Sequence, residues 1–295
     1  MSRVQIALLP GGRRLHLQDG PIDLIVEAFG APGAVHAAYR AAAARFATVL
    51  DELCAELALL RRPAAPGGTA LCGTVARRMY DAVAPFAAEG FITPMAAVAG
   101  SVAEEVLGAM TGAAALTRAY VNNGGDIALH LGPGARFGIG MIDRPDRPSL
   151  FGRTAIASGD PVRGIATSGR YGRSFSLGIA DAVTVLAPTA AAADAAATVI
   201  ANAVDLPGHP AIRRVPAIEL QPDSDLGDRL VTRQVEHLMP EEAEAALAAG
   251  LARAEAIRAR GLIASAALHL QGRTAVLDEP AADFPSISER AFAHG

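Results

Sequence analysis

The spacing of apolar residues along this chain predicts strands at the start, a helical region, and then a second region of strands and helices. Short alternating runs at 4–9, 13–18 and 22–28 predict three strands. From residue 35 to about residue 60, apolar side chains recur every three or four positions, which predicts a long helix. Helical spacing also covers 75–86 and 94–110.

The rest of the chain returns to strands. Strand-like runs occur at 119–121, 127–131, 137–142, 179–186, 218–220, 262–270 and 274–277, and helical spacing at 190–204 and 241–260. Because strands and helices form separate blocks, the pattern predicts an α+β fold with an antiparallel sheet and packed helices. We expect residues 1–295 to form one domain, in which 1–70 is an N-terminal strand and helix segment and 97–204 carries the motifs.

The composition excludes several classes of functional site. All 26 basic residues are arginine, so the chain has no lysine for a Schiff base or a Walker A loop, and a phosphate site must use arginine, backbone amides or a metal ion. The net charge of −4, without a basic tract that carries aromatic residues, argues against nucleic acid as a partner. Cys54 and Cys72 are too few for a disulfide framework or a zinc site.

No uncharged run approaches the roughly 18 apolar residues that a membrane span needs. The first ten residues contain no long apolar leader segment. We therefore expect a cytoplasmic protein without a membrane partner, and a homo-oligomer is compatible with these features.

Three segments carry candidate chemistry. Asn122–Asp126 lies between two strand-like runs and fits either a hairpin turn or a glycine turn that lets a ligand approach the backbone. Thr167–Arg173 supplies hydroxyls, glycines, two guanidinium groups and an aromatic ring, and fits either a plain loop or an anion site. Asp194 and Thr198 are four residues apart on a predicted helix, so they share a face and provide oxygen ligands suited to Mg²⁺.

Taken in this order, the segments resemble the ApbE superfamily of FAD:protein FMN transferases. Asn122–Ile127 is similar to its NxGGDI element, Ala166–Phe175 to TSGxYxRxF, and 183–198 to VTVxA…ADAxxT. The resemblance implies an ApbE-like, T-fold-related α+β domain. It also implies Mg²⁺ held by Asp194, Thr198 and the Ala99 carbonyl. The implied nucleotide or flavin site is lined by Asn123, Gly124, Gly125, Asp126, Thr167, Ser168, Gly169, Tyr171 and Arg173.

The chain departs from the transferases between the second and third elements. They carry His and Asp-Pro-x-Thr-Gly there, whereas this chain has Ser176-Leu-Gly-Ile-Ala-Asp-Ala182. Phe91–Gly100 and Pro222–Gly227 instead resemble a cytoplasmic, uncharacterised ApbE-like subfamily.

The resemblance therefore implies a phosphorylated nucleotide or flavin, with FAD and FMN as candidates, bound with Mg²⁺ but without protein flavinylation. A FAD:protein FMN transferase and a non-catalytic structural or regulatory protein stay open as alternatives. Ser168 and Asp181 are the nearby acid–base or nucleophile candidates, and neither has a visible partner base in the sequence.

Overall fold

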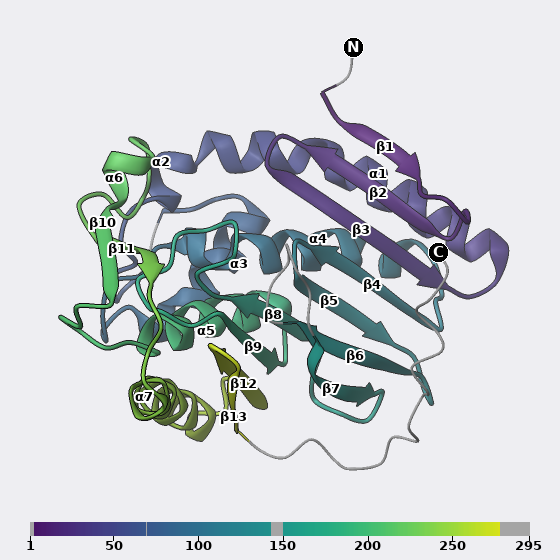
Figure 1. Ribbon diagram of the computed structural model, residues 1–295. Coiled ribbons are helices and arrows are strands. Elements are labelled where there is room, and N and C mark those ends of the chain that lie inside the picture. The colour runs from purple at the N-terminus through teal and green to yellow at the C-terminus, as the bar shows by residue number, and fades with distance from the viewer. Residues whose placement is uncertain (1–2, 69, 143–149, 278–295) are drawn as a thin grey trace.

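A nine-stranded antiparallel sheet runs through the computed structural model, which describes residues 3–68, 70–142 and 150–277 (Figure 1). Hydrogen-bonded neighbours follow the spatial order β1-β2-β3-β4-β5-β8-β9-β12-β13. The strands of this sheet are β1 (Gln5–Leu8), β2 (Arg14–Asp19), β3 (Ile22–Phe29), β4 (Arg118–Asn123), β5 (Asp126–Leu131), β8 (Gly164–Ser168), β9 (Ala182–Ala187), β12 (Ser265–Leu270) and β13 (Arg273–Leu277). The predicted α+β class with an antiparallel sheet is confirmed.

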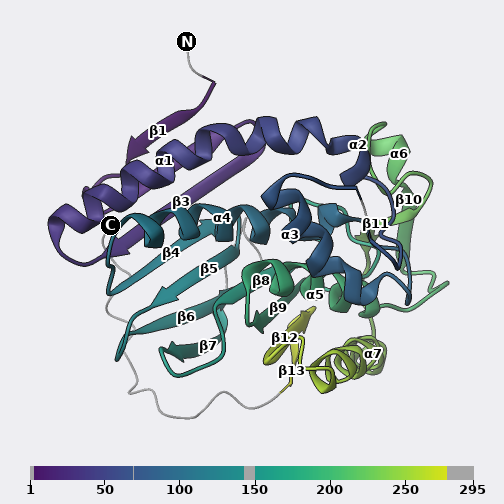
Figure 2. The ribbon, with the colours of Figure 1, turned by 180° about the vertical axis from the view of Figure 1, so that it is seen from behind.

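Helices pack on one face of this sheet, and α1, α3 and α4 lie in front of the strands in Figure 2. The long helices are α1 (Pro32–Ala55), α3 (Thr74–Val83), α4 (Val98–Ala113), α5 (Ala190–Ala203) and α7 (Pro240–Ala259). Short turns complete the set: α2 (Leu57–Leu60), α6 (Ala217–Leu220), and the 3₁₀ turns η1 (Ala84–Phe86) and η2 (Pro94–Ala97). Among the described residues, no helix has the length and apolar character needed to cross a bilayer.

The core has two main parts, one in each half of the sheet. Phe46 of α1, Met79 of α3 and Val26 of β3 lie fully buried in the first part. Ile200 of α5 and Leu268 of β12 lie fully buried in the second. In the first half, three strands (β1–β3) precede the helices and two strands (β4 and β5) follow them. In the second half, β8 and β9 precede the helices and β12 and β13 follow them, with the β10–β11 pair lying between α5 and α7 in the sequence. β5 and β8 join the halves through only two register pairs.

Two small antiparallel pairs lie outside the main sheet. β6 (Arg136–Ile142) pairs with β7 (Leu150–Ala157), and β10 (Ile212–Pro216) pairs with β11 (Leu230–Val235). Ile156 of β7 packs against Leu129, Leu131 and Ile165 in a cluster separate from the two core parts under the helices.

The structure corrects several predicted elements. Residues 218–220 belong to the short helix α6 and not to a strand. β9 begins at Ala182 instead of residue 179, because the Ile179 amide donates to the Val204 carbonyl outside the sheet. Strands β7, β8, β10 and β11 were not predicted, and β8 places Thr167 and Ser168, which were interpreted as the start of a loop or anion site, inside the sheet.

Candidate functional site

The tight turn between β4 and β5 brings polar side chains to the helix-covered side of the sheet. Gly124 and Gly125 form the turn with φ angles of +67° and +116°, which only glycine adopts without strain in a two-residue hairpin. The Gly125 amide donates to Asn122 Oδ1 at 2.8 Å, and Asn123 Nδ2 donates to the Ala99 carbonyl at 3.2 Å. The segment is therefore a hairpin turn that is also tied to the start of α4.

Asp194 reaches the same place from α5. Thr189 begins this helix, and its hydroxyl oxygen accepts from the Ala192 amide at 3.2 Å. One turn later, Asp194 Oδ2 accepts from the Gly100 amide at 2.9 Å. Thr198 follows after one further turn, and both side chains are half-buried. Asp194 thus satisfies a first-turn amide of the neighbouring helix α4.

The close crossing of α4 and α5 depends on Gly100. A Cβ atom at this position would lie 2.3 Å from the Ala190 carbonyl oxygen, so any side chain would force the helix backbones apart. Small residues on both helices allow this approach, because α5 is rich in buried alanine. The crossing is what holds Asp194 against the first turn of α4.

The charges of the Asp126 and Asp194 carboxylates interact, and both groups have shifted pKa values. Burial raises the pKa of Asp126 to about 7, although the Thr167 amide and the Arg173 guanidinium favour its charged form. The pKa of Asp194 is raised well above its ordinary value, first by burial and then by the charge of Asp126, while the Gly100 and Ala99 amides oppose the shift. Two half-buried carboxylates, one of which disfavours the charged form of the other, form a place where a cation is stabilised.

Strand β8 supplies the third side of the site. The Thr167 amide donates to Asp126 Oδ1 at 3.2 Å, and its hydroxyl shares a 3.0 Å hydrogen bond with Thr184. Ser168 ends the strand, half-buried and paired in register with Val183. Gly169 is buried, and its carbonyl accepts from the Gly172 amide at 3.0 Å.

The two arginines after β8 have different surroundings. Arg170 pairs with Asp181 at 2.7 Å and lies over the Tyr171 ring, 4.2 Å from its centroid. Asp181 also accepts from the Gln271 amide at 2.6 Å, so both of its carboxylate oxygens are engaged. These contacts hold the loop together and leave Asp181 poorly placed to act as a free acid or base.

Arg173 instead extends to the hairpin turn. A Cβ at residue 124 would lie 2.2 Å from Arg173 Nη2, and Nη1 donates to the Pro21 carbonyl at 3.2 Å. Arg173 is exposed, and its charge favours the ionised form of Asp126. It is therefore the guanidinium of this loop that belongs to the carboxylate site.

The structure brings most of the predicted residues together. One site contains Ala99, Asn123, Gly124, Asp126, Thr167, Arg173 and Asp194. Within the described part of the chain, no group of three or more His, Cys, Asp or Glu side chains could hold a metal ion, so the carboxylates of this site are a pair. Glu104 also belongs to this region, although it was not predicted: its carboxylate accepts from the Ala191 amide at 2.7 Å. No local feature of the sequence reveals a cap that another helix supplies.

One family model matches nearly the whole described region. The family model described as AbpE bacteria matches residues 6–276. A UPF0280 protein of Methanopyrus kandleri is 41% identical over 129 residues, covering 43% of this chain and 48% of that protein. A UPF0280 protein of Methanoculleus marisnigri is 46% identical over 121 residues, covering 40% and 48%. The chain thus spans about half the length of these curated relatives.

Solved structures provide a more distant comparison. A variant of the flavin transferase ApbE from Vibrio cholerae is 14% identical with a TM-score of 0.47, covering 90% of this chain and 97% of that one. The apo flavinyl transferase ApbE of Pseudomonas stutzeri is 13% identical with a TM-score of 0.45, covering 93% of each chain.

Proposed function

Because the chain belongs to the AbpE bacteria family, whose model covers residues 6–276, we propose that its site binds a phosphorylated nucleotide or flavin together with Mg²⁺. The observation that carries the proposal is the pair formed by Asp126 and Asp194. Burial raises the pKa of each, and the charge of Asp126 raises that of Asp194 further, so ionisation of both carboxylates calls for added positive charge. A divalent cation would supply that charge.

The residues fit Mg²⁺ in particular. Mg²⁺ takes oxygen ligands, usually one or two carboxylates with the rest from phosphate and water, and the site offers two carboxylates rather than a complete protein cage. Asp194, Thr198 and the Ala99 carbonyl are the groups that would hold it. When bound, the ion would neutralise phosphate charge.

Protein residues would position the remainder of the ligand. Arg173 carries an exposed guanidinium beside the Gly124 turn, which suits a phosphate oxygen. The turn itself has no Cβ atoms, so a ligand can approach its backbone closely. Asp126 would accept a hydrogen bond from a ribose or adenine group, or share the cation with Asp194.

The proposal does not include transfer of FMN to a protein. The interval 176–182, where the transferases carry their His and Asp-Pro-x-Thr-Gly segment, is engaged in structural contacts. Ser176 Oγ donates to the Gly178 carbonyl at 3.3 Å, the Leu177 amide donates to Asn202 Oδ1 at 3.0 Å, and Asp181 is paired with Arg170. None of these groups is arranged as a nucleophile with a base.

Thermal unfolding with FAD, FMN or ATP, each with and without Mg²⁺, tests the proposal. A ligand at about 100 times its Kd is expected to stabilise the protein by about 2.7 kcal/mol, and the gain should require Mg²⁺. Asp194→Ala should lose the gain, whereas Asp228→Asn, which alters an exposed carboxylate before β11, should keep it. Absence of any ligand-dependent shift in the unaltered protein would favour the non-catalytic structural alternative.

A second assay addresses the transferase alternative. The protein is incubated with FAD, Mg²⁺ and an acceptor peptide that contains the threonine targeted by the transferases, and the peptide mass is measured. We expect the peptide to stay unmodified. Covalent FMN on the peptide would restore the transferase assignment.

A further inference from the structure

Helices α4 and α5 supply carboxylates to each other's first turns. Asp194 of α5 accepts from the Gly100 amide of α4 at 2.9 Å, and Glu104 of α4 accepts from the Ala191 amide of α5 at 2.7 Å. Both contacts satisfy amides that have no partner within their own helix, and both place negative charge at the positive end of a helix dipole. Two contacts therefore determine the position of Asp194. One is its own hydrogen bond with Gly100, and the other is the hydrogen bond of Glu104 with Ala191 at the start of the same helix.

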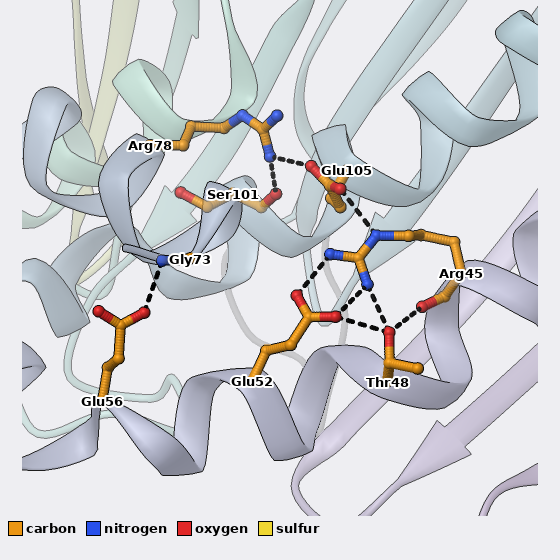
Figure 3. Close-up of polar contacts among 8 residues, drawn as sticks. All are labelled: Arg45, Thr48, Glu52, Glu56, Gly73, Arg78, Ser101 and Glu105. Carbon is orange, nitrogen blue, oxygen red and sulfur yellow. Dashed lines mark hydrogen bonds and ion pairs between the residues drawn. The ribbon is translucent and has the colours of Figure 1, made fainter. Parts of the chain in front are cut away.

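Glu104 is itself held in place from the opposite side. Its second carboxylate oxygen lies 3.2 Å from Arg78 Nε of α3. Figure 3 shows the remaining contacts of Arg78, which donates to the Ser101 carbonyl at 3.1 Å and to Glu105 at 2.8 Å. Glu105 in turn accepts from Arg45 of α1 at 2.7 Å. One Glu104 oxygen thus faces α5 while the other is fixed by an anchored arginine.

We propose that Glu104 is a positioning residue for the carboxylate pair, and that by capping α5 it holds Asp194 where this carboxylate can share a divalent cation with Asp126. The proposal rests on the proposed cation site. Ala191 is 2% exposed, so without Glu104 its amide would be left buried and unsatisfied, and the first turn of α5 would shift to find a partner. Asp194 lies three residues further along the helix and would move with it.

Two substitutions separate capping from charge. Glu104→Gln keeps an oxygen that can accept from the Ala191 amide but removes the charge. Glu104→Asp keeps the charge but is one methylene shorter, so the carboxylate is withdrawn from the amide. Glu105→Asp is the matched control, because the neighbouring residue shares Arg78 but pairs with α1 and α3, through Arg45 and Arg78.

The measurement is the affinity for Mn²⁺, read from the electron paramagnetic resonance signal of the free ion, with and without FAD. Mn²⁺ prefers oxygen ligands as Mg²⁺ does. We expect Glu104→Asp to weaken Mn²⁺ binding about tenfold, the lower end of the range for residues that orient metal ligands. Glu104→Gln and Glu105→Asp should stay within about twofold of the unaltered protein. A purely structural role would lower the unfolding midpoint without changing the affinity of the folded fraction.

The outcomes distinguish this inference from the proposed function. If the unaltered protein binds no Mn²⁺ in either condition, the cation site itself fails. If it binds Mn²⁺, and Asp194→Asn does not, but Glu104→Asp binds as well as Glu105→Asp, the positioning role is wrong while the site stands. Weak binding by Glu104→Gln with normal binding by Glu104→Asp would also overturn it, because charge and not capping would then matter.

A further variant tests the proposal in case Glu104→Asp does not fold. Arg78→Gln removes the group that orients Glu104 without changing the cap, and it should weaken Mn²⁺ binding about threefold. Unchanged affinity in that variant, compared with Glu105→Asp, would contradict the proposal.

Discussion

Asp126 holds a proton more tightly in the folded protein than in the unfolded chain, because burial raises its pKa from 3.8 to about 7. Between these two values the folded state binds more protons than the unfolded state, so the free energy of unfolding must fall as pH rises through this window. The contribution is fully present below about pH 4 and is lost above about pH 7. Asp194 shifts in the same direction and adds to the trend.

Asp126→Asn should therefore stabilise the cation-free protein at high pH. The amide keeps the oxygen that accepts from Thr167 but carries no charge to repel Asp194. In EDTA at pH 8 we expect a gain on the order of 1–2 kcal/mol in urea unfolding, and almost none at pH 4. Asp228→Asn, an exposed control, should show neither effect. Equal stability of Asp126→Asn and the unaltered protein at pH 8 would contradict the assigned burial of this carboxylate.

At the scale of single elements, the α4–α5 crossing should tolerate no side chain at residue 100. Gly100→Ala places a Cβ 2.3 Å from a carbonyl oxygen of the backbone, which can move only if α5 moves. We expect a loss of about 3 kcal/mol in the free energy of unfolding, measured by chemical denaturation.

Gly108 provides the matched control in the same helix. It is exposed, and a Cβ there meets nothing within 4 Å. Gly108→Ala should therefore stabilise the protein by about 0.5–1 kcal/mol through helix propensity alone. A similar response of both glycines would mean that the close crossing does not limit the packing.

Strands β3 and β8 show how far the sequence could be used to predict the structure. Alternation is clear in β3, where Ile22, Leu24 and Val26 are buried, and the strand was predicted within one residue at its end. In contrast, β8 reads Gly-Ile-Ala-Thr-Ser and its first three residues are all buried, so it lacks the period of two that marks a strand with one solvent-facing side. Central strands covered on both faces lose this signal.

The site was predictable in part for a related reason. Glycines at the β4–β5 turn and the spacing of Asp194 and Thr198 are local features. The structure brings Asn123 beside that turn and Asp194 to the same first turn of α4. The exchange of caps between α4 and α5 depends on residues about ninety positions apart, and the choice of Arg173 over Arg170 depends on Asp181. Contacts of this kind arise only from the tertiary fold.

For the whole molecule, the two halves should unfold together. β5 and β8 share only two register pairs, so the sheet alone joins the halves weakly, but each of the helices α4 and α5 needs the other half to satisfy its first turn. In native-state hydrogen exchange, we expect the slowest amides of β3–β4 and of β9–β12 to report the same free energy of opening. Exchange of one strand pair at a clearly lower free energy would show that its half opens independently.

The main sheet consists of two units, one containing β1–β5 and the other β8, β9, β12 and β13, and this has a consequence for how the site is assembled. Asp126 belongs to the first unit and Asp194 to the second, and they meet where the units join. Both units are parts of one polypeptide, so their encounter is intramolecular and occurs at an effective concentration that the connecting chain sets. Dilution of the protein therefore leaves the meeting of these two carboxylates unchanged.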